Sequence, residues 1–295
     1  MIDLDRVIRI PARCRNIFKG VVLTAFVLGL MAPGLARGYV LQGPHLLDLM
    51  IKALGQAKTL RIEQTVLVSD ASLSEQPIEM KETLNYYFPD RFRCDTRFDN
   101  TQRIHVAAFD QALTIVDGQQ VSYQASGVDR YKDLILFRSP LMLHKMLLNS
   151  GIDVGTTSLG RDNERIVYII GAQYPDETAP QVWVDKESLL PVKWLYISSA
   201  APEDHWVFVY SGWRKKDDFW YPSVVELYFN QQLIRKITAT QVILNPELPL
   251  QLFDIALLMS QYPVAQSLLE KDSSTSDPTD DVKQTIEEFQ KRFGD

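Results

Sequence analysis

The sequence predicts one large domain of antiparallel β-strands with a few helices, of the all-β or α+β class. Short segments that alternate apolar and polar side chains recur about every ten residues, with turn residues between them. In the clearest segment, Phe92, Cys94 and Phe98 fall on one side and Arg93 and Arg97 on the other, because strand side chains alternate across a sheet. Such a sheet has one buried and one wetted face, in a barrel or a sandwich.

The first 38 residues have the pattern of a secretory signal peptide. A basic stretch precedes an apolar run at 21–31 and a small-residue stretch at 32–38, the usual order of such signals. The run is shorter than the roughly 20 apolar residues that span a bilayer, which favours cleavage after Ala36 or Gly38 over a retained membrane anchor. We therefore expect export, with a domain at 39–258 and an acidic tail at 259–295.

Removal of the leader makes the chain strongly acidic. Six of the 31 basic and two of the 37 acidic residues lie in 1–38, so the remainder carries a net charge of about −10. This charge argues against binding nucleic acid. Cys94 is the one cysteine after the leader, so no internal disulfide is expected, and a small buried side chain is the simplest role for it.

The first part of the domain is expected to contain an opening helix and a strand meander. Apolar residues at helical spacing predict the helix over 43–58. Asp117-Gly118 is a typical hairpin turn between two of the later strands. The predicted strands cover 60–68, 78–86, 92–98, 103–109, 112–116 and 120–124.

The segment 128–149 interrupts this strand pattern. It is rich in Leu and Met and predicts a helix broken near Ser139-Pro140, with Pro140 in the first turn of a second helix and Ser139 as its cap. Two interpretations are open: a core helix packed on the sheet, or a movable lid over an apolar groove.

A second series of strands follows, and then a polar tail. The aromatic residues at 206–210, with Trp213, Trp220 and Tyr221, suit a ligand groove or an ordinary core. The tail at 273–281 is predicted to be disordered, with a short helix at 282–293. The strands are expected at 164–171, 180–186, 190–198, 203–213, 218–230 and 233–244.

Three blocks of the sequence carry a family resemblance. They are the Pro89-led strand with its later Val-Asp-Gly turn, the hairpin 182–193 that ends in Leu-Pro-Val-Lys, and the closing stretch 245–253, Asn-Pro-Glu-Leu-Pro followed by Phe253. In this order, with a helical interruption between the meanders, they resemble the LolA-like superfamily of periplasmic proteins that carry or sense lipoproteins. The resemblance covers about residues 46–257.

The resemblance implies an α+β fold: a strongly curved antiparallel sheet that forms an unclosed barrel, with helices over its concave face. It also implies a periplasmic protein that holds lipid or lipoprotein acyl chains, taken from an inner-membrane donor and passed to an outer-membrane acceptor. Burial of each CH₂ contributes about 0.8 kcal/mol without polar contacts. The expected lining, for which ordinary core packing is the alternative, comprises Ile62, Val66, Met80, Leu84, Phe92, Phe98, Ile104 and Val106, with Leu136, Leu143 and Met146 from the lid.

Two departures separate this chain from the carriers. Carriers commonly place an Arg directly before the Pro of the third strand, where it helps to hold the lid closed, and this chain has Phe88 there. The chain is also longer, around 174–180 and 200–206. A sensing or interaction protein of the same fold, which recognises a protein partner without carrying lipid, is therefore the alternative function.

The sequence does not predict an enzyme, a metal site or a cofactor. No H-E-x-x-H, nucleophile elbow, Gly-rich phosphate loop or CxxC motif is present. His105 is expected on the outer face of its strand. Glu203, Asp204 and His205 are adjacent in a predicted strand, so their side chains point to opposite faces and form no triad.

Overall fold

The computed structural model describes residues 40–69, 76–197, 204–266 and 268, all within the unit Val40–Asp295. The predicted signal peptide and the predicted tail helix at 282–293 lie outside the described residues. No helix among the described residues has the length and apolar character needed to cross a membrane.

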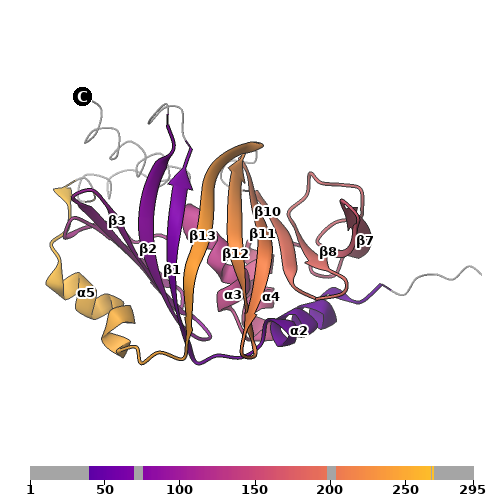
Figure 1. Cartoon of the computed structure of the whole chain (residues 1–295), viewed down its shortest axis with the longest axis horizontal. Helices are drawn as coiled ribbons and strands as arrows, with labels where there is room; N and C mark the ends of the chain where they lie inside the picture. The colour runs from indigo at the N-terminus through magenta and orange to yellow at the C-terminus, as the bar shows by residue number, and fades with distance from the viewer. Residues whose placement is uncertain (1–39, 70–75, 198–203, 267, 269–295) are drawn as a thin grey trace, which may run out of the picture. The chain divides into compact units, whose positions relative to one another are not determined.

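Thirteen strands form one antiparallel sheet in the described residues (Figure 1). Its order is β6-β5-β4-β3-β2-β1-β13-β12-β11-β10-β9-β8-β7, so two meanders meet where β1 pairs with β13, and β6 and β7 form the edges. The strands are β1 Thr59–Val68, β2 Ile78–Tyr87, β3 Arg91–Phe98, β4 Thr101–Ala108, β5 Gln111–Val116, β6 Gln119–Ser122, β7 Thr157–Asp162, β8 Arg165–Ile170, β9 Gln181–Asp185, β10 Pro191–Ile197, β11 His205–Lys216, β12 Phe219–Phe229 and β13 Gln232–Leu244.

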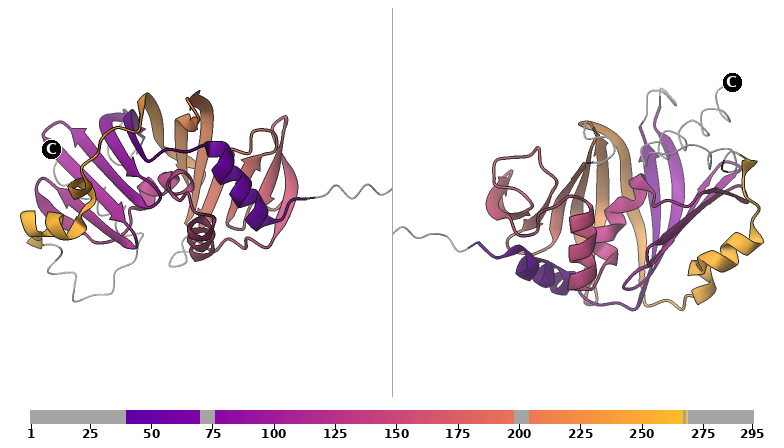
Figure 2. Two further views of the ribbon diagram at one scale, coloured as in Figure 1. Left: turned by 90° about the horizontal axis from the view of Figure 1, so that it is seen from below. Right: turned by 180° about the vertical axis from the view of Figure 1, so that it is seen from behind.

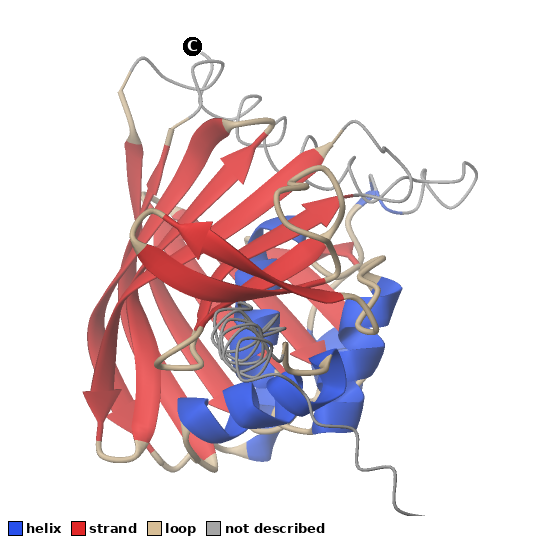
Figure 3. Cartoon of the chain, turned by 90° about the vertical axis from the view of Figure 1, so that its right-hand side faces the viewer, coloured by secondary structure: helices blue, strands red, loops and turns tan. Residues whose placement is uncertain are grey.

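The connection between the two edge strands is helical and crosses one face of the sheet. It holds the 3₁₀ helix η1 (Gly127–Lys132), α3 (Asp133–Leu136) and α4 (Pro140–Asn149), beside which α2 (Gly43–Leu54) packs. Figure 2 and Figure 3 show these helices on the inner side of the curved sheet. A connection from one edge to the other must pass over a face, and here it covers the face that the sequence predicts to be apolar.

The other face is covered at the β3–β5 end by a C-terminal segment. It contains η2 (Leu250–Phe253) and α5 (Ile255–Gln261), which contact β3, β4 and β5. Beyond α5 the chain runs along edge strand β6: the amide of Gln120 donates to Pro263 O and the amide of Ala265 donates to Gln120 O, each at 2.9 Å. This contact includes a parallel bridge between Gln120 and Val264.

The apolar side chains form one large and two smaller clusters. The main cluster lies on the helix-covered face and joins strand residues such as Ile62, Trp194 and Phe208 to Leu143 and Leu147 of α4. A second cluster joins β4 and β5 to α5, and a third lies around Trp183. The core is therefore on both sides of the sheet, with most of it under the crossing helices.

The predicted α+β class with an unclosed, curved antiparallel sheet is confirmed, with local differences. Strand β7 and helix α5 were not predicted. Ser139 precedes α4 as expected, but its side chain makes no capping hydrogen bond. The opening helix stops at Leu54 because Gly55 takes φ +85°, and a Cβ there would overlap the carbonyl oxygen of Asp218.

Candidate functional site

The candidate site is the helix-covered face, which the sheet residues Ile62, Leu84 and Cys94 define together with the crossing segment 127–149. Cross-strand pairing fixes which side chains share this face: Ile62 pairs with Leu84, Leu84 with Cys94, and Cys94 with His105. Side chains of directly paired residues lie on the same side of a sheet.

Most residues of the expected lining meet in the main cluster on this face. These are Ile62, Val66, Leu84, Phe92, Leu136 and Leu143, and Met146 packs at its margin. Met80 is buried beside Val66, its partner in the ladder, and Phe98 is half-buried at the end of β3.

Two residues of the expected lining lie on the opposite face. Ile104 and Val106 belong to the second cluster, with Ile255 and Leu258 of α5. The pairing of Cys94 with His105 places odd-numbered residues of β4 under the crossing helices. The expectation that His105 lies on the outer face is therefore wrong: it is fully buried, and its Nδ1 lies 2.9 Å from Thr114 Oγ1.

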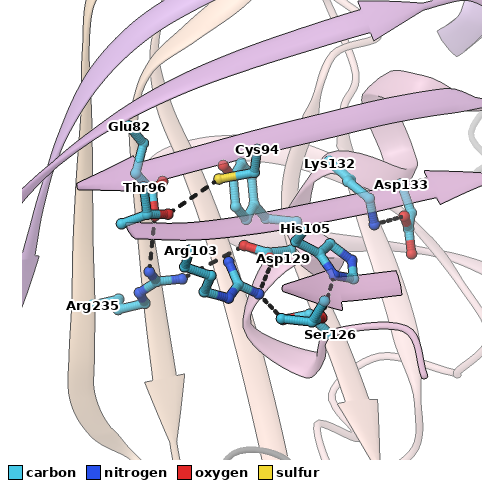
Figure 4. A network of polar contacts seen from close by, with 12 residues as sticks. Glu82, Cys94, Thr96, Arg103, His105, Ser126, Asp129, Lys132, Asp133 and Arg235 are labelled. Atoms are coloured by element: carbon cyan, nitrogen blue, oxygen red, sulfur yellow. Dashed lines mark hydrogen bonds and ion pairs between the residues drawn. The ribbon is translucent and has the colours of Figure 1, made fainter. Parts of the chain in front are cut away.

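A buried polar network occupies the part of the helix-covered face nearest β2–β4 (Figure 4). Arg103 Nη2 donates to Asp129 Oδ2 at 2.7 Å and to Ser126 Oγ at 3.1 Å. Arg235 reaches in from β13 and donates to Glu82 Oε1 at 3.1 Å, with its Nη1 3.7 Å from Asp129 Oδ1. Two guanidinium groups thus neutralise two carboxylates.

Neutral side chains complete the shell around Glu82. Gln64 Nε2 donates to Glu82 Oε2 at 2.7 Å and to Tyr131 Oη at 3.0 Å. Thr96 Oγ1 donates to Glu82 Oε1 at 3.1 Å. A buried carboxylate needs such donors, because the cost of removing it from water is otherwise several kcal/mol.

This environment sets the ionisation of the neighbouring groups. Burial would raise the pKa of Asp129, but the Arg103 guanidinium, with His105 and Arg235, holds it well below its usual value. Burial lowers the pKa of His105 to about 3, so the ring is neutral at pH 7. Burial, and then the charge of Glu82, raises the pKa of Cys94, which is therefore a thiol and not a nucleophilic thiolate.

Arg138 lies in the turn between α3 and α4 and differs from the other buried cations. Its three side-chain nitrogens are buried, and no described residue accepts a hydrogen bond from them. The guanidinium carbon lies 5.0 Å from the ring centroid of Phe88 and 4.7 Å from that of Phe219. Phe88, which directly precedes Pro89, is thus an aromatic partner of an Arg that comes from the crossing segment.

The polar network was missed, although part of it has a sequence signal. Strand alternation already places Gln64 between Ile62 and Val66, and Glu82 between Met80 and Leu84, on the buried side. The positions of Arg103 and Arg235 in the network could be predicted only with knowledge of the sheet register. No three His, Cys, Asp or Glu side chains in the described part of the chain are grouped to hold a metal ion.

Comparison with solved structures identifies the fold. An outer membrane lipoprotein-sorting domain from Vibrio parahaemolyticus superposes with a TM-score of 0.50 at 12% identity, over 73% of this chain and 97% of its own. A LolA superfamily protein from Nitrosomonas europaea gives 0.53 at 7% identity, over 74% and 99%. A DUF1329 family protein from Desulfovibrio piger gives 0.50 at 12% identity, over 74% and 98%.

The sequence itself gave no such match: neither the protein-family models nor the curated proteins returned a relative. The identities of the three structures are too low to carry more than architecture. Each nevertheless aligns over nearly its whole length. The chain has the LolA-superfamily fold, an unclosed antiparallel sheet with helices across its inner face.

Proposed function

We propose that the protein is periplasmic and binds lipid or lipoprotein acyl chains on the helix-covered face. The observation that carries this proposal is the position of the largest apolar cluster, between the sheet and a helical segment that crosses from edge to edge. In this proposal, α4 moves and the apolar residues beneath it receive the chain. A role in moving lipoproteins toward the outer membrane follows from the same binding mode.

The way α4 is anchored supports a movable cover. Of its ten residues, Leu143 and Leu147 are the ones that are fully buried, whereas α2 buries five of twelve. Exposing two leucines costs about 3–6 kcal/mol in all. Burial of roughly four to eight methylene groups of a bound chain offsets that cost, so an ordinary acyl chain is long enough to replace the helix.

The test is to isolate the processed protein gently from the periplasm and record native and denaturing mass spectra. We expect co-purifying lipid or acylated peptide, lost when Leu143 on the helix-covered face is changed to Gln. Leu258→Gln, on α5 at the opposite face, is the matched control and should keep the lipid. A protein that is free of ligand and takes up no fluorescent fatty acid would contradict the proposal.

A second candidate function is recognition of a protein partner by the same fold. It is favoured by the outer side of α4, where Leu141 is 78% and Leu148 is 53% exposed. The two leucines are seven residues apart in α4, so they lie on one face of the helix about two turns apart, and an exposed apolar face of this kind suits a contact surface. Photo-crosslinking from position 141 in the periplasm, combined with no lipid uptake, would favour this function over the first.

A further inference from the structure

We propose that Arg138 binds the anionic oxygen group, phosphate or carboxylate, of an amphiphile whose acyl chain lies on the helix-covered face. The inference rests on the proposed function and narrows its ligand class. It makes the turn between α3 and α4 the site of a head group and the apolar face beneath α4 the site of the chain.

The first support is that no described residue supplies a counter-ion for the buried charge of Arg138. Arg103 and Arg235 contact carboxylates, and Lys132 donates to Asp133 at 2.8 Å. Arg138 has no hydrogen-bond acceptor among the described residues. Its two ring contacts return about 2 kcal/mol or less each, whereas an unpaired buried cation costs several kcal/mol. The described residues therefore leave the guanidinium of Arg138 unsatisfied, which is typical of a ligand site.

The charge of Arg138 remains available for a ligand. Burial lowers its pKa to about 9, with the Tyr86 phenol acting in the opposite direction, so the group is still mainly protonated at pH 7. Guanidinium is planar, and its parallel N–H groups match two oxygens of a carboxylate or phosphate. Its contacts with the rings of Phe88 and Phe219 hold the guanidinium group in place without using its N–H donors.

The second support comes from the start of α4. The chain passes from Arg138 to the N-cap Ser139, whose side chain makes no capping bond, and the first turn of the helix has no acidic residue. A helix N-terminus favours negative charge, because its first amide groups have no partner within the helix. Both features thus favour an anion at the same turn.

The position of this turn links an anion to an acyl chain. Leu136, two residues before Arg138, is buried in the main cluster, and Leu143, in the first turns of α4, is buried there as well. If α4 swings about the segment 137–139, the freed apolar surface begins beside the guanidinium. A ligand with a charged end and an apolar chain can then use both features together.

The experiment measures binding of three probes by calorimetry: dodecyl phosphate, dodecyl maltoside and inorganic phosphate. We expect the wild type to bind dodecyl phosphate at least tenfold tighter than the uncharged maltoside. Arg138→Gln should lose this preference and still bind the maltoside. Arg130→Gln is the matched control, because Arg130 lies in the same segment and stacks 4.3 Å over the Tyr196 ring; it should keep the preference.

Thermal melting without ligand separates a binding role from a structural one. Removal of an unpaired buried charge should leave the melting temperature of Arg138→Gln unchanged or higher, whereas loss of a structural contact would lower it. Arg138→Lys keeps the charge without the fork, so the preference should fall but not vanish. A preference equal to that of wild type in both variants, or a large drop in melting temperature with an unchanged preference, overturns the inference.

The three probes also distinguish this inference from the proposed function. Equal binding of dodecyl phosphate and dodecyl maltoside by the wild type overturns the anion site and leaves acyl-chain binding intact. Binding of neither dodecyl probe overturns the proposed function. If inorganic phosphate then binds in an Arg138-dependent way, the anion is a free one, and the amphiphile proposed here is also excluded.

Discussion

The two meanders of the sheet bury different chemistry on the same face. Under the crossing helices, β2–β5 present Glu82, Thr96, Arg103 and His105, whereas β8–β12 present mainly aromatic and aliphatic side chains, among them Tyr168, Val182, Trp194, Phe208 and Leu227. Arg235 of β13 joins the two halves through Glu82. Hydrogen-bonded ions require fixed partners and directions, while apolar contacts do not. The comparison indicates that the β2–β5 half keeps a fixed structure, whereas the β8–β12 half can repack.

The largest test of this comparison removes one charge from the polar half. Arg103→Met leaves the fully buried carboxylate of Asp129 without its 2.7 Å partner. We expect the free energy of unfolding, measured with urea, to fall by about 3–5 kcal/mol. Arg93→Met, which removes a partly exposed partner of Asp95, is the control and should cost about 1 kcal/mol or less. Equal losses of stability in the two variants would contradict the conclusion that the buried ion pair of Arg103 and Asp129 holds this half of the sheet in shape.

A second test uses pH. The folded-state pKa of His105 is about 3, below the ordinary value of 6.5. As the pH falls, the ring therefore takes up a proton in the unfolded chain before it does so in the folded protein. The contribution of neutral His105 to the free energy of unfolding is fully present above about pH 6.5 and is lost as the pH falls toward 3. Between pH 7 and pH 5 this loss should be about 2 kcal/mol. The lowered pKa of Asp129 acts at more acidic pH, below about 4.

Substitution of His105 by Gln should remove that part of the pH dependence. The measurement is urea unfolding of both proteins at pH 7 and pH 5. A variant whose stability falls as much as that of wild type would show that the ring is not the titrating group.

The smallest test compares two changes that conserve volume. Thr96→Val removes a donor to Glu82 and should cost about 1–3 kcal/mol. Leu227→Met in the apolar half should cost less than about 1.5 kcal/mol. Thermal or urea unfolding measures both, and a larger cost at Leu227 would reverse the proposed division between a fixed and an adaptable half.

Much of the fold was predictable because strand side chains alternate. The pattern in 92–98 predicted β3 and its buried side, and Pro140 marked the start of α4. Strand β7, Thr-Ser-Leu-Gly-Arg-Asp, has little alternation, and α5 has seven residues, too few for a clear helical period.

The candidate site was predictable only in part. Alternation places Glu82 on a buried face, but its partner Arg235 is 153 residues away, and only the pairing of β1 with β13 brings the two together. The face of His105 likewise depends on its pairing with Cys94. The burial of Arg138 without a hydrogen-bond acceptor among the described residues depends on packing that no local sequence pattern describes.

The contact between β6 and residues 263–265 has a consequence for self-association. An unclosed sheet ends in two rows of backbone donors and acceptors, which other chains can extend into intermolecular sheets. The C-terminal segment occupies part of one row by pairing with Gln120. Pro263 has no backbone N–H, so it cannot donate a hydrogen bond to a strand of another chain. Residues 263–265 therefore cover part of the β6 edge and oppose edge-to-edge polymerisation, a role separate from anything that binds under α4.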